Sequence, residues 1–229
     1  MNPKEFYDLM YGDEFDERTP VTKTGTLHKI LQRYSVNRYE LIEENLPGQG
    51  RVLDLGCGDG ELLFAMSNKY DEVWGVDVVQ KRVDRITTKT GGGKIHLKVA
   101  DINERLDFTS NYFDCVTIVD VLEHLFDPFA IIGECYRLLQ PGGTLLVHVP
   151  NVAFVMNRLR LAGGKLPVTS KASGWDGGHL HYFTRSSLKQ LLEKEGFSVM
   201  KITAGGLFRK IRNIWGSLLS SDILIVGQR

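Results

Sequence analysis

The stretch that decides the fold is RVLDLGCGDG, residues 51–60. Its first five residues have the apolar character of a buried strand, and three glycines alternate with other residues in the turn that follows. Glycine lets the backbone turn tightly and approach a ligand, and the start of the next helix presents free N–H groups. A strand, a glycine-rich turn and a helix in this order predict a nucleotide-binding site.

The spacing of the glycines narrows the kind of nucleotide. A dinucleotide fingerprint, GxGxxG, would need its third glycine at position 61, where this chain has Glu61. A nicotinamide-dependent oxidoreductase is therefore the disfavoured alternative. Asp54 stands two residues before the first glycine, and an acid at that place suits a ligand that carries a cationic amine better than a pyrophosphate.

Segments with strand and helix character alternate from residue 51 onward. This pattern predicts a parallel sheet with helices on both faces, and ligands of such sheets bind at the carboxyl ends of the strands. We expect strands over 51–55, 72–78, 95–100, 113–121, 144–149, 197–203 and 222–227, and helices over 61–70, 80–90, from Pro128 onward and over 186–194.

Two further acids fall where strands end. Asp77 ends the second strand, 17 residues after Gly60, where a carboxylate can accept both hydroxyls of a ribose. Asp101 ends the third strand, where it could accept from an adenine amino group with the Ile102 N–H beside it. The alternatives are a helix N-cap for Asp77 and a loop cap for Asp101.

Five motifs now follow one another in a recognisable order. They are VLDLGCGDGELL, VWGVDV, VADI, FDCVTIVDVLEHLFDP and LLQPGGTLLVHVPN. Together they cover roughly residues 50–150, and the chain there resembles the class I S-adenosylmethionine-dependent methyltransferases. A weaker likeness runs through HYFTRSSLKQLLEKEGF to the end, as in small-molecule methyltransferases of the ubiquinone-biosynthesis type.

The resemblance implies an α/β fold and a set of cofactor contacts. The fold would be a Rossmann-like, seven-stranded, mostly parallel sheet of order 3-2-1-4-5-7-6 with the last strand antiparallel. The cofactor would be S-adenosylmethionine, held at its methionine moiety by the loop backbone, at its ribose by the acid of the second strand, and at its adenine by the acid of the third. The implied cofactor residues are Asp54, Gly56, Cys57, Gly58, Gly60, Asp77, Val78, Asp101, Ile102 and, on the side facing the acceptor, Asp120.

Methyl transfer to oxygen usually needs a general base. Glu123 and His124 follow the fourth strand directly, and His124 is the first candidate; the alternative is that it caps the loop while Glu123 faces solvent or backbone. His179 and His181 flank Leu180 and would face one side of an extended segment, and they are further catalytic candidates. One of them could contact the acceptor; the alternative is a structural role. No third ligand of suitable spacing is visible in the sequence, so we expect no metal.

The chain is expected to form a single domain of 1–229 with three regions. Residues 1–50 would form an N-terminal helical cap with a helix over 27–45, and Tyr7 and Tyr11 in this arm either close over the cofactor or simply pack. Residues 51–150 would bind the cofactor. Residues 151–229 would supply the acceptor side and the closing strands, with a long connection over 151–182.

The predicted cofactor region and the predicted acceptor region differ in net charge. The whole chain carries 28 basic and 28 acidic residues, which speaks against nucleic-acid binding. Residues 1–150 have a net charge of −8 and residues 151–229 a net charge of +8, which favours an anionic acceptor, either a small molecule or a lipid-like compound. The alternative is that both halves fold together and their charges interleave in space. A basic amphipathic segment, 207–219, predicts a lid, ordinary core packing or peripheral membrane contact.

Location and activity complete the expectations. Three cysteines without a CxxC pair, an acidic N-terminus and no long apolar run favour a cytoplasmic protein. The leading hypothesis is an S-adenosylmethionine-dependent methyltransferase. The alternatives are a cofactor-binding subunit without its own catalysis and the oxidoreductase named above; oligomeric state is left open.

Overall fold

A computed structural model describes residues 35–36, 38–90, 93–170, 178–207 and 215–229. Its centre is a seven-stranded sheet of order β4-β3-β2-β5-β6-β9-β7. The strands are β2 (Arg51–Leu55), β3 (Glu72–Asp77), β4 (Ile95–Val99), β5 (Phe113–Val119), β6 (Leu139–Pro150), β7 (Ser198–Thr203) and β9 (Asp222–Gln228).

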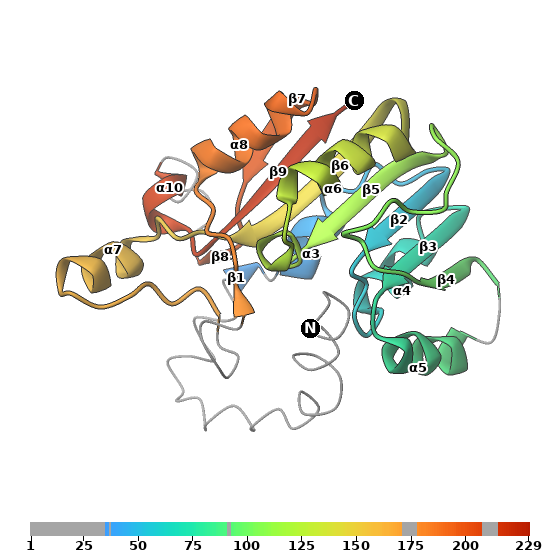
Figure 1. Cartoon of the computed structure of the whole chain (residues 1–229), viewed down its shortest axis with the longest axis horizontal. Coiled ribbons are helices and arrows are strands. Elements are labelled where there is room, and N and C mark those ends of the chain that lie inside the picture. Colours follow the sequence, from blue (N-terminus) through green and yellow to red (C-terminus); the bar gives the residue numbers. More distant parts are fainter. Residues whose placement is uncertain (1–34, 37, 91–92, 171–177, 208–214) are drawn as a thin grey trace.

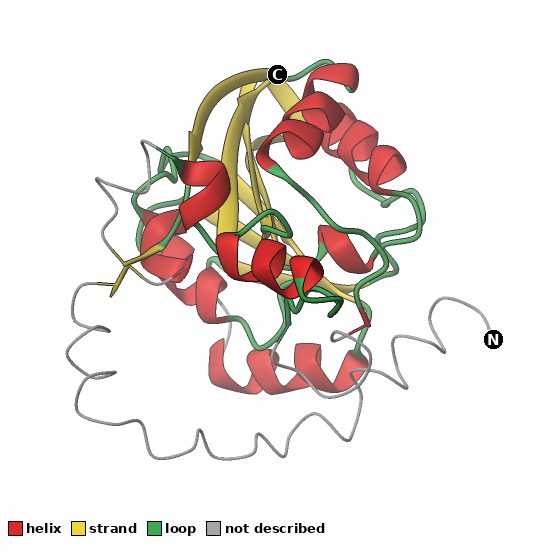
Figure 2. Cartoon of the chain, turned by 90° about the vertical axis from the view of Figure 1, so that its left-hand side faces the viewer, coloured by secondary structure: helices red, strands yellow, loops and turns green. Residues whose placement is uncertain are grey.

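The topology confirms the predicted sheet. Neighbouring strands from β4 to β6 pair in parallel, whereas β9 runs antiparallel to both β6 and β7. Figure 1 shows the strands side by side in this order, and Figure 2 shows helices on both sides of the twisted sheet. Parallel strands need crossover connections. Helices supply these except between β4 and β5, where residues 100–112 contain no helix.

Two cores lie on opposite faces of the sheet because side chains alternate along each strand. One core gathers α6 (Pro128–Leu138) and α8 (Arg185–Lys194) against the sheet. The other gathers α3 (Arg38–Glu43), α4 (Glu61–Ser67) and Ile86 of α5 (Gln80–Thr90). Along β9, Ile223 and Ile225 join the first core and Leu224 between them joins the second.

Local signals place the helix starts. Asp127 precedes α6, where its side chain accepts from the N–H groups of Phe129 and Ala130, and Pro128 fills the first helical position. Thr184 and Ser187 form a reciprocal capping box at the start of α8. These starts lie within one or two residues of the predictions.

The N-terminal prediction needs a correction. A continuous helix over 27–45 is wrong in the described part, since Ser35–Val36 form strand β1 and α3 begins only at Arg38. Strand β1 pairs antiparallel with β8 (Gly206–Leu207) in a small second sheet. Local periodicity cannot reveal this pairing, because its partner is about 170 residues away in the sequence. Tyr7 and Tyr11 lie outside the described residues.

The acceptor-side region also differs from expectation. The long connection contains a helix that was not predicted, α7 (Val155–Ala162), which projects from the body of the molecule in Figure 1. The basic amphipathic segment 207–219 begins with Leu207, which belongs to β8, and its described end contains the short helix α10 (Gly216–Leu219). Residues 208–214 lie outside the described residues.

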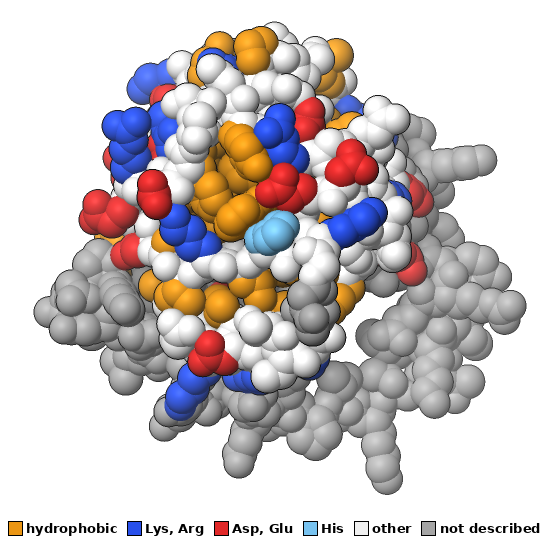
Figure 3. All heavy atoms as spheres, turned by 90° about the vertical axis from the view of Figure 1, so that its right-hand side faces the viewer, with side chains coloured by type: hydrophobic (Ala, Val, Ile, Leu, Met, Phe, Trp, Pro, Cys, Tyr) orange, Lys and Arg blue, Asp and Glu red, His pale blue; other side chains and the backbone are white. Residues whose placement is uncertain are grey.

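The β4 edge of the sheet presents a partly exposed aromatic cluster. Trp74 stacks on His96 and meets the edge of Phe108. Figure 3 shows the side of the molecule that carries this edge, with hydrophobic side chains gathered between charged ones.

Candidate functional site

The glycine loop follows β2 and is fastened to the end of β3. The N–H groups of Gly56 and Cys57 both donate to the Val76 carbonyl, at 2.8 and 3.0 Å. Gly58 N–H donates to Asp77 Oδ2 at 2.9 Å. The Cys57 side chain is buried in the core, and burial raises the pKa of its thiol, so the loop backbone rather than this side chain is available to a ligand.

Gly56 has a φ of +75°, and a Cβ there would lie 2.4 Å from Cγ2 of Val121. We expect Gly56→Ala to lower the free energy of unfolding by about 2–4 kcal/mol, because a left-handed backbone and a steric overlap add. Gly58→Ala is the matched control, since Gly58 also has a positive φ of +55° but an added Cβ meets nothing within 4 Å. Urea denaturation of both variants measures the difference, and equal losses would contradict the role given to Val121.

Asp54 is buried beneath this loop and accepts a hydrogen bond from Thr117 Oγ1 at 2.6 Å. Burial raises the pKa of its carboxyl to about 7, against the opposing effect of the Thr117 hydrogen bond, and Asp77 raises it further. The side chain is therefore close to half-charged at neutral pH, and a cationic ligand nearby would favour its charged form.

The Asp77 carboxylate holds the glycine loop in place and can accept further hydrogen bonds. Its Oδ2 accepts from Gly58 N–H and its Oδ1 accepts from Val79 N–H at 2.9 Å, so the capping alternative is part of its function. Burial raises the pKa of this carboxyl, while the two backbone donors counteract the rise. Each carboxylate oxygen has two lone-pair sites, and one on each oxygen stays available for a ribose. Val78 beside it is half-buried.

Asp101 and Ile102 follow β4 at the same edge. Asp101 Oδ1 accepts from both the backbone N–H and the side-chain amide of Asn103, at 2.9 and 2.8 Å. This is the loop-capping arrangement, and it leaves Oδ2 for another donor. Ile102 is buried in the first core.

Asp120 directly follows β5 and has a φ of 53°. Its Oδ1 receives a hydrogen bond from Nδ1 of the buried His148 at 2.7 Å, and His148 Nε2 lies 3.9 Å from Asp222. Burial lowers the pKa of His148, but Asp120 and Asp222 outweigh it and raise this pKa to about 10. An imidazolium therefore holds Asp120 as a carboxylate, and the pKa of Asp120 is lowered despite its burial.

Arg38 of α3 forms an ion pair with the other oxygen of Asp120. It also donates to the hydroxyl of Tyr39, which in turn donates to Glu61 at the start of α4. Sequence analysis missed both Arg38 and His148. A histidine inside the otherwise apolar run of β6 was the one signal for His148, whereas Arg38 carries no local signal.

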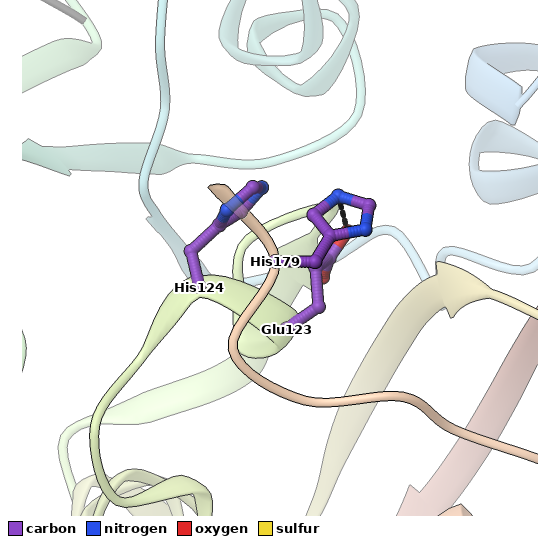
Figure 4. A group of neighbouring side chains, drawn as sticks. All are labelled: Glu123, His124 and His179. Carbon is purple, nitrogen blue, oxygen red and sulfur yellow. Dashed lines mark ion pairs between the residues drawn. The ribbon is translucent and has the colours of Figure 1, made fainter. Parts of the chain in front are cut away.

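Glu123, His124 and His179 form a compact group, here called the Glu123 cluster. Each residue can offer one ligand atom, and these atoms lie within 4.8 Å of one another. Figure 4 shows the carboxylate beneath the His179 ring, with the His124 ring beside it. The alternative in which Glu123 faces solvent is wrong, because its side chain is 1% exposed. Burial raises the pKa of its carboxyl to about 8.

The spacing of residues in the sequence did not reveal Glu123 as a possible third ligand beside His124 and His179. Glu123 lies on the 3₁₀ turn η2 (Leu122–His124), more than 50 residues before His179. Its backbone carbonyl accepts from the N–H groups of Leu180 and His181, at 2.8 and 3.0 Å. His181 is not part of the cluster; its ring lies beside that of Phe183, with centroids 6.4 Å apart.

Beyond the cluster, the acceptor-side segment exposes large apolar side chains. Met156, Leu159 and Leu161 of α7 are more than half exposed. Within the described residues, no helix has the length and apolar character needed to cross a membrane.

Comparison with known proteins places these residues in context. The model of a family described as a methyltransferase domain matches residues 27–202. A ubiquinone biosynthesis O-methyltransferase of Xanthomonas axonopodis pv. citri is 34% identical over 126 residues, which are 54% of this chain and 53% of that protein. The chain thus spans about half the length of the first curated relatives that it matches.

Two further matches extend over more of the chain. A demethylmenaquinone methyltransferase of Leptospira interrogans is 29% identical over 199 residues, which are 75% of each chain. Among solved structures, an S-adenosylmethionine-dependent methyltransferase of Methanosarcina mazei superimposes with a TM-score of 0.63 at 23% identity, covering 85% of this chain and 99% of that one. The structural likeness supports the fold alone.

Proposed function

This chain belongs to the methyltransferase domain family, in the class I S-adenosylmethionine-dependent group that its motifs resemble, and from that premise we propose that it methylates an oxygen of a small, lipid-like acceptor. The observation that carries the proposal is the row of carboxylates at one sheet edge. Asp54, Asp77, Asp101 and Asp120 stand at or just after the ends of four neighbouring parallel strands.

This row matches the cofactor group by group. S-adenosylmethionine carries a sulfonium and an ammonium, and a carboxylate-rich edge attracts both. Asp77 serves the ribose hydroxyls, and Asp101 with Ile102 serves the adenine. Arg38, beside Asp120, supplies the cation that the carboxylate of the methionine moiety needs.

The reaction needs a deprotonated acceptor close to the methyl group. Bound S-adenosylmethionine would supply a methyl group on a sulfonium sulfur: the acceptor oxygen would take the methyl carbon, and the electron pair of the broken C–S bond would stay on sulfur as a neutral thioether. The acceptor proton must leave before or during this step. The Glu123 cluster lies beside Asp120 and is the group of side chains best placed to remove the acceptor proton. His181 is a further candidate.

Two observations support a lipid-like, anionic acceptor. Exposed apolar side chains of α7 alternate with Arg158 and Arg160, so the acceptor side offers both hydrophobic area and positive charge. The relatives are named as enzymes of ubiquinone biosynthesis and of demethylmenaquinone methylation. Within the described part of the 207–219 segment, which includes α10, the exposed Trp215 would supply the peripheral membrane contact.

Calorimetry and a transfer assay test the proposal in two steps. We expect S-adenosylmethionine and its demethylated product to bind while NADH does not; preference for NADH would reject the proposal. Radiolabelled methyl transfer is then measured with ortho-dihydroxy aromatic acceptors that carry a short or a long alkyl chain. Cofactor binding without transfer to any of these acceptors would favour a cofactor-binding subunit.

Histidine variants locate the proton-removing group. We expect His179→Ala to lower kcat by about 100-fold or more, in the range that a general base contributes, with little change in cofactor affinity. His181→Ala is the matched control two residues away and should change KM for the acceptor more than kcat. The reverse pattern would move the proton-removing role from the cluster to His181.

A further inference from the structure

Three polar side chains form a row across the neighbouring strands β5, β6 and β9. His148 of β6 is 3% exposed and stands in a run of buried apolar residues. Asp120 directly follows β5 on one side of it, and Asp222 begins β9 on the other. His148 pairs with Val119 of β5 and with Leu224 of β9, so each acid lies within two residues of a strand partner of the histidine. The sheet itself therefore brings one imidazole between two carboxylates.

Both ring nitrogens of His148 face an acid. Nδ1 lies 2.7 Å from Asp120 Oδ1, the length of a charge-assisted hydrogen bond. Nε2 lies 3.9 Å from Asp222 Oδ2, which is a close charge pair without a hydrogen bond. Burial lowers the pKa of His148, but the two acids outweigh burial and raise it to about 10. The ring is therefore an imidazolium, and it fixes one oxygen of Asp120.

The other oxygen of Asp120 holds Arg38. These two side chains form an ion pair, so His148 and Arg38 bind opposite oxygens of one carboxylate. The Arg38 side chain is 47% exposed, so this ion pair and a hydrogen bond to Tyr39, more than packing, set where its guanidinium lies. A reorientation of Asp120 would therefore move the cation that the proposed function assigns to the methionine carboxylate.

The far end of the row is tied to the segment that carries Arg38. Asp222 Oδ1 accepts from Gly205 N–H at 2.8 Å. The strand that follows Gly205 is β8, and it pairs with β1, which ends two residues before Arg38. The contacts thus form a closed ring that runs through Arg38, Asp120, His148, Asp222, Gly205, β8 and β1. The charged row and the small sheet fix the same arginine from two sides.

We propose that His148 is a positioning residue for the amino-acid end of the cofactor: it fixes Asp120, and through Asp120 it fixes the Arg38 guanidinium that receives the methionine carboxylate. This role rests on the proposed function, which supplies the cofactor. His148 acts through Asp120 and not by contact with a ligand, because its ring is buried within the sheet layer. A purely structural role would affect every part of the cofactor site alike, whereas this role concerns one end of it.

The test compares two ligands of the full chain by calorimetry. The demethylated cofactor product carries the amino-acid end, whereas methylthioadenosine has the same adenosine and sulfur without it. We expect His148→Leu to weaken binding of the product by about 10-fold or more, as the loss of a charged hydrogen bond does, and to leave methylthioadenosine binding within about twofold. His148→Asn has nearly the shape of Leu but keeps an N–H donor toward Asp120, so it should weaken product binding by only about threefold.

A double-variant cycle shows whether His148 acts through Arg38. Arg38→Met should weaken product binding by about 10-fold in the wild-type chain and by less than about threefold in the His148→Leu background, because both changes remove the same contact. His96→Leu is the matched control. This half-buried histidine stacks on Trp74 at the β4 edge, and its replacement should leave the binding of both ligands unchanged.

The outcomes separate the role of His148 from the proposed function. Equal weakening of both ligands by His148→Leu, unchanged product binding, or fully additive effects of the two substitutions would overturn the role. If His148→Leu does not fold, His148→Asn decides in its place, by whether its loss is confined to the product. A wild-type chain that binds both ligands but transfers no methyl group would reject the proposed function and leave the role standing, and a wild-type chain that binds neither would reject both.

Discussion

Asp77→Asn should weaken the binding of S-adenosylmethionine and of its demethylated product by about 100-fold, because two hydrogen bonds from ribose hydroxyls to a charged acceptor are lost or turned into weaker neutral ones. The amide keeps one oxygen, and its NH₂ group cannot accept from either backbone donor. Gly58 N–H or Val79 N–H therefore loses its partner as well, and the glycine loop is less well held.

Calorimetry measures this effect, and a nearby carboxylate gives the control. Asp84 lies on α5, is exposed, and accepts only from the side chain of Gln80 among the hydrogen bonds described. Asp84→Asn removes the same charge a short distance along the chain and should leave cofactor affinity within about twofold, as a screened surface charge does. Unchanged binding by Asp77→Asn would remove Asp77 from the ribose role.

Asp54→Asn is expected to change stability and cofactor binding in opposite directions. The pKa of this carboxyl is about 7 in the folded chain, against an ordinary value of 3.8. The folded chain therefore holds a proton that the unfolded chain has already lost between these two values, and stability falls as the pH rises through this window. At pH 8 the cost of the buried charge is fully present, with an upper limit of about 4 kcal/mol.

The amide removes that cost and can still accept from Thr117 Oγ1. We expect the free energy of unfolding at pH 8 to rise by about 1–3 kcal/mol and to change little at pH 4.5, as urea denaturation at both values would show. Cofactor affinity of the wild type should increase from pH 6 to pH 8 as Asp54 ionises, and this increase should be absent in the variant. A less stable variant at pH 8 would show that the charge is well compensated in the fold.

The cofactor edge was predictable because its signals are local. Each acid stands at the end of a strand, and strand ends could be located from apolar runs, so Asp54, Asp77, Asp101 and Asp120 fall at one edge as expected. The sheet order followed from the resemblance, which the pairing confirms. The ribose, adenine and methionine roles themselves stay predictions.

The acceptor side was less predictable because its contacts are long-range. The Glu123 cluster joins a turn after β5 to a segment beyond α7, and no periodicity connects the two. The Asp120–His148 pair joins different strands, and Arg38 reaches Asp120 from the N-terminal side. Burial of Glu123 also ran against its residue type, because a charged side chain next to a strand end usually faces solvent.

The hydrogen bonds from the Leu180 and His181 N–H groups to the Glu123 carbonyl link the cluster to residues 178–183, the proposed acceptor wall, through backbone atoms only. Any residue except proline can provide the same N–H group, so the position of this wall does not depend on which side chains occupy 180 and 181. The side chains there are half-exposed or exposed. The side chains at these two positions can therefore be replaced while the backbone link to Glu123 is kept.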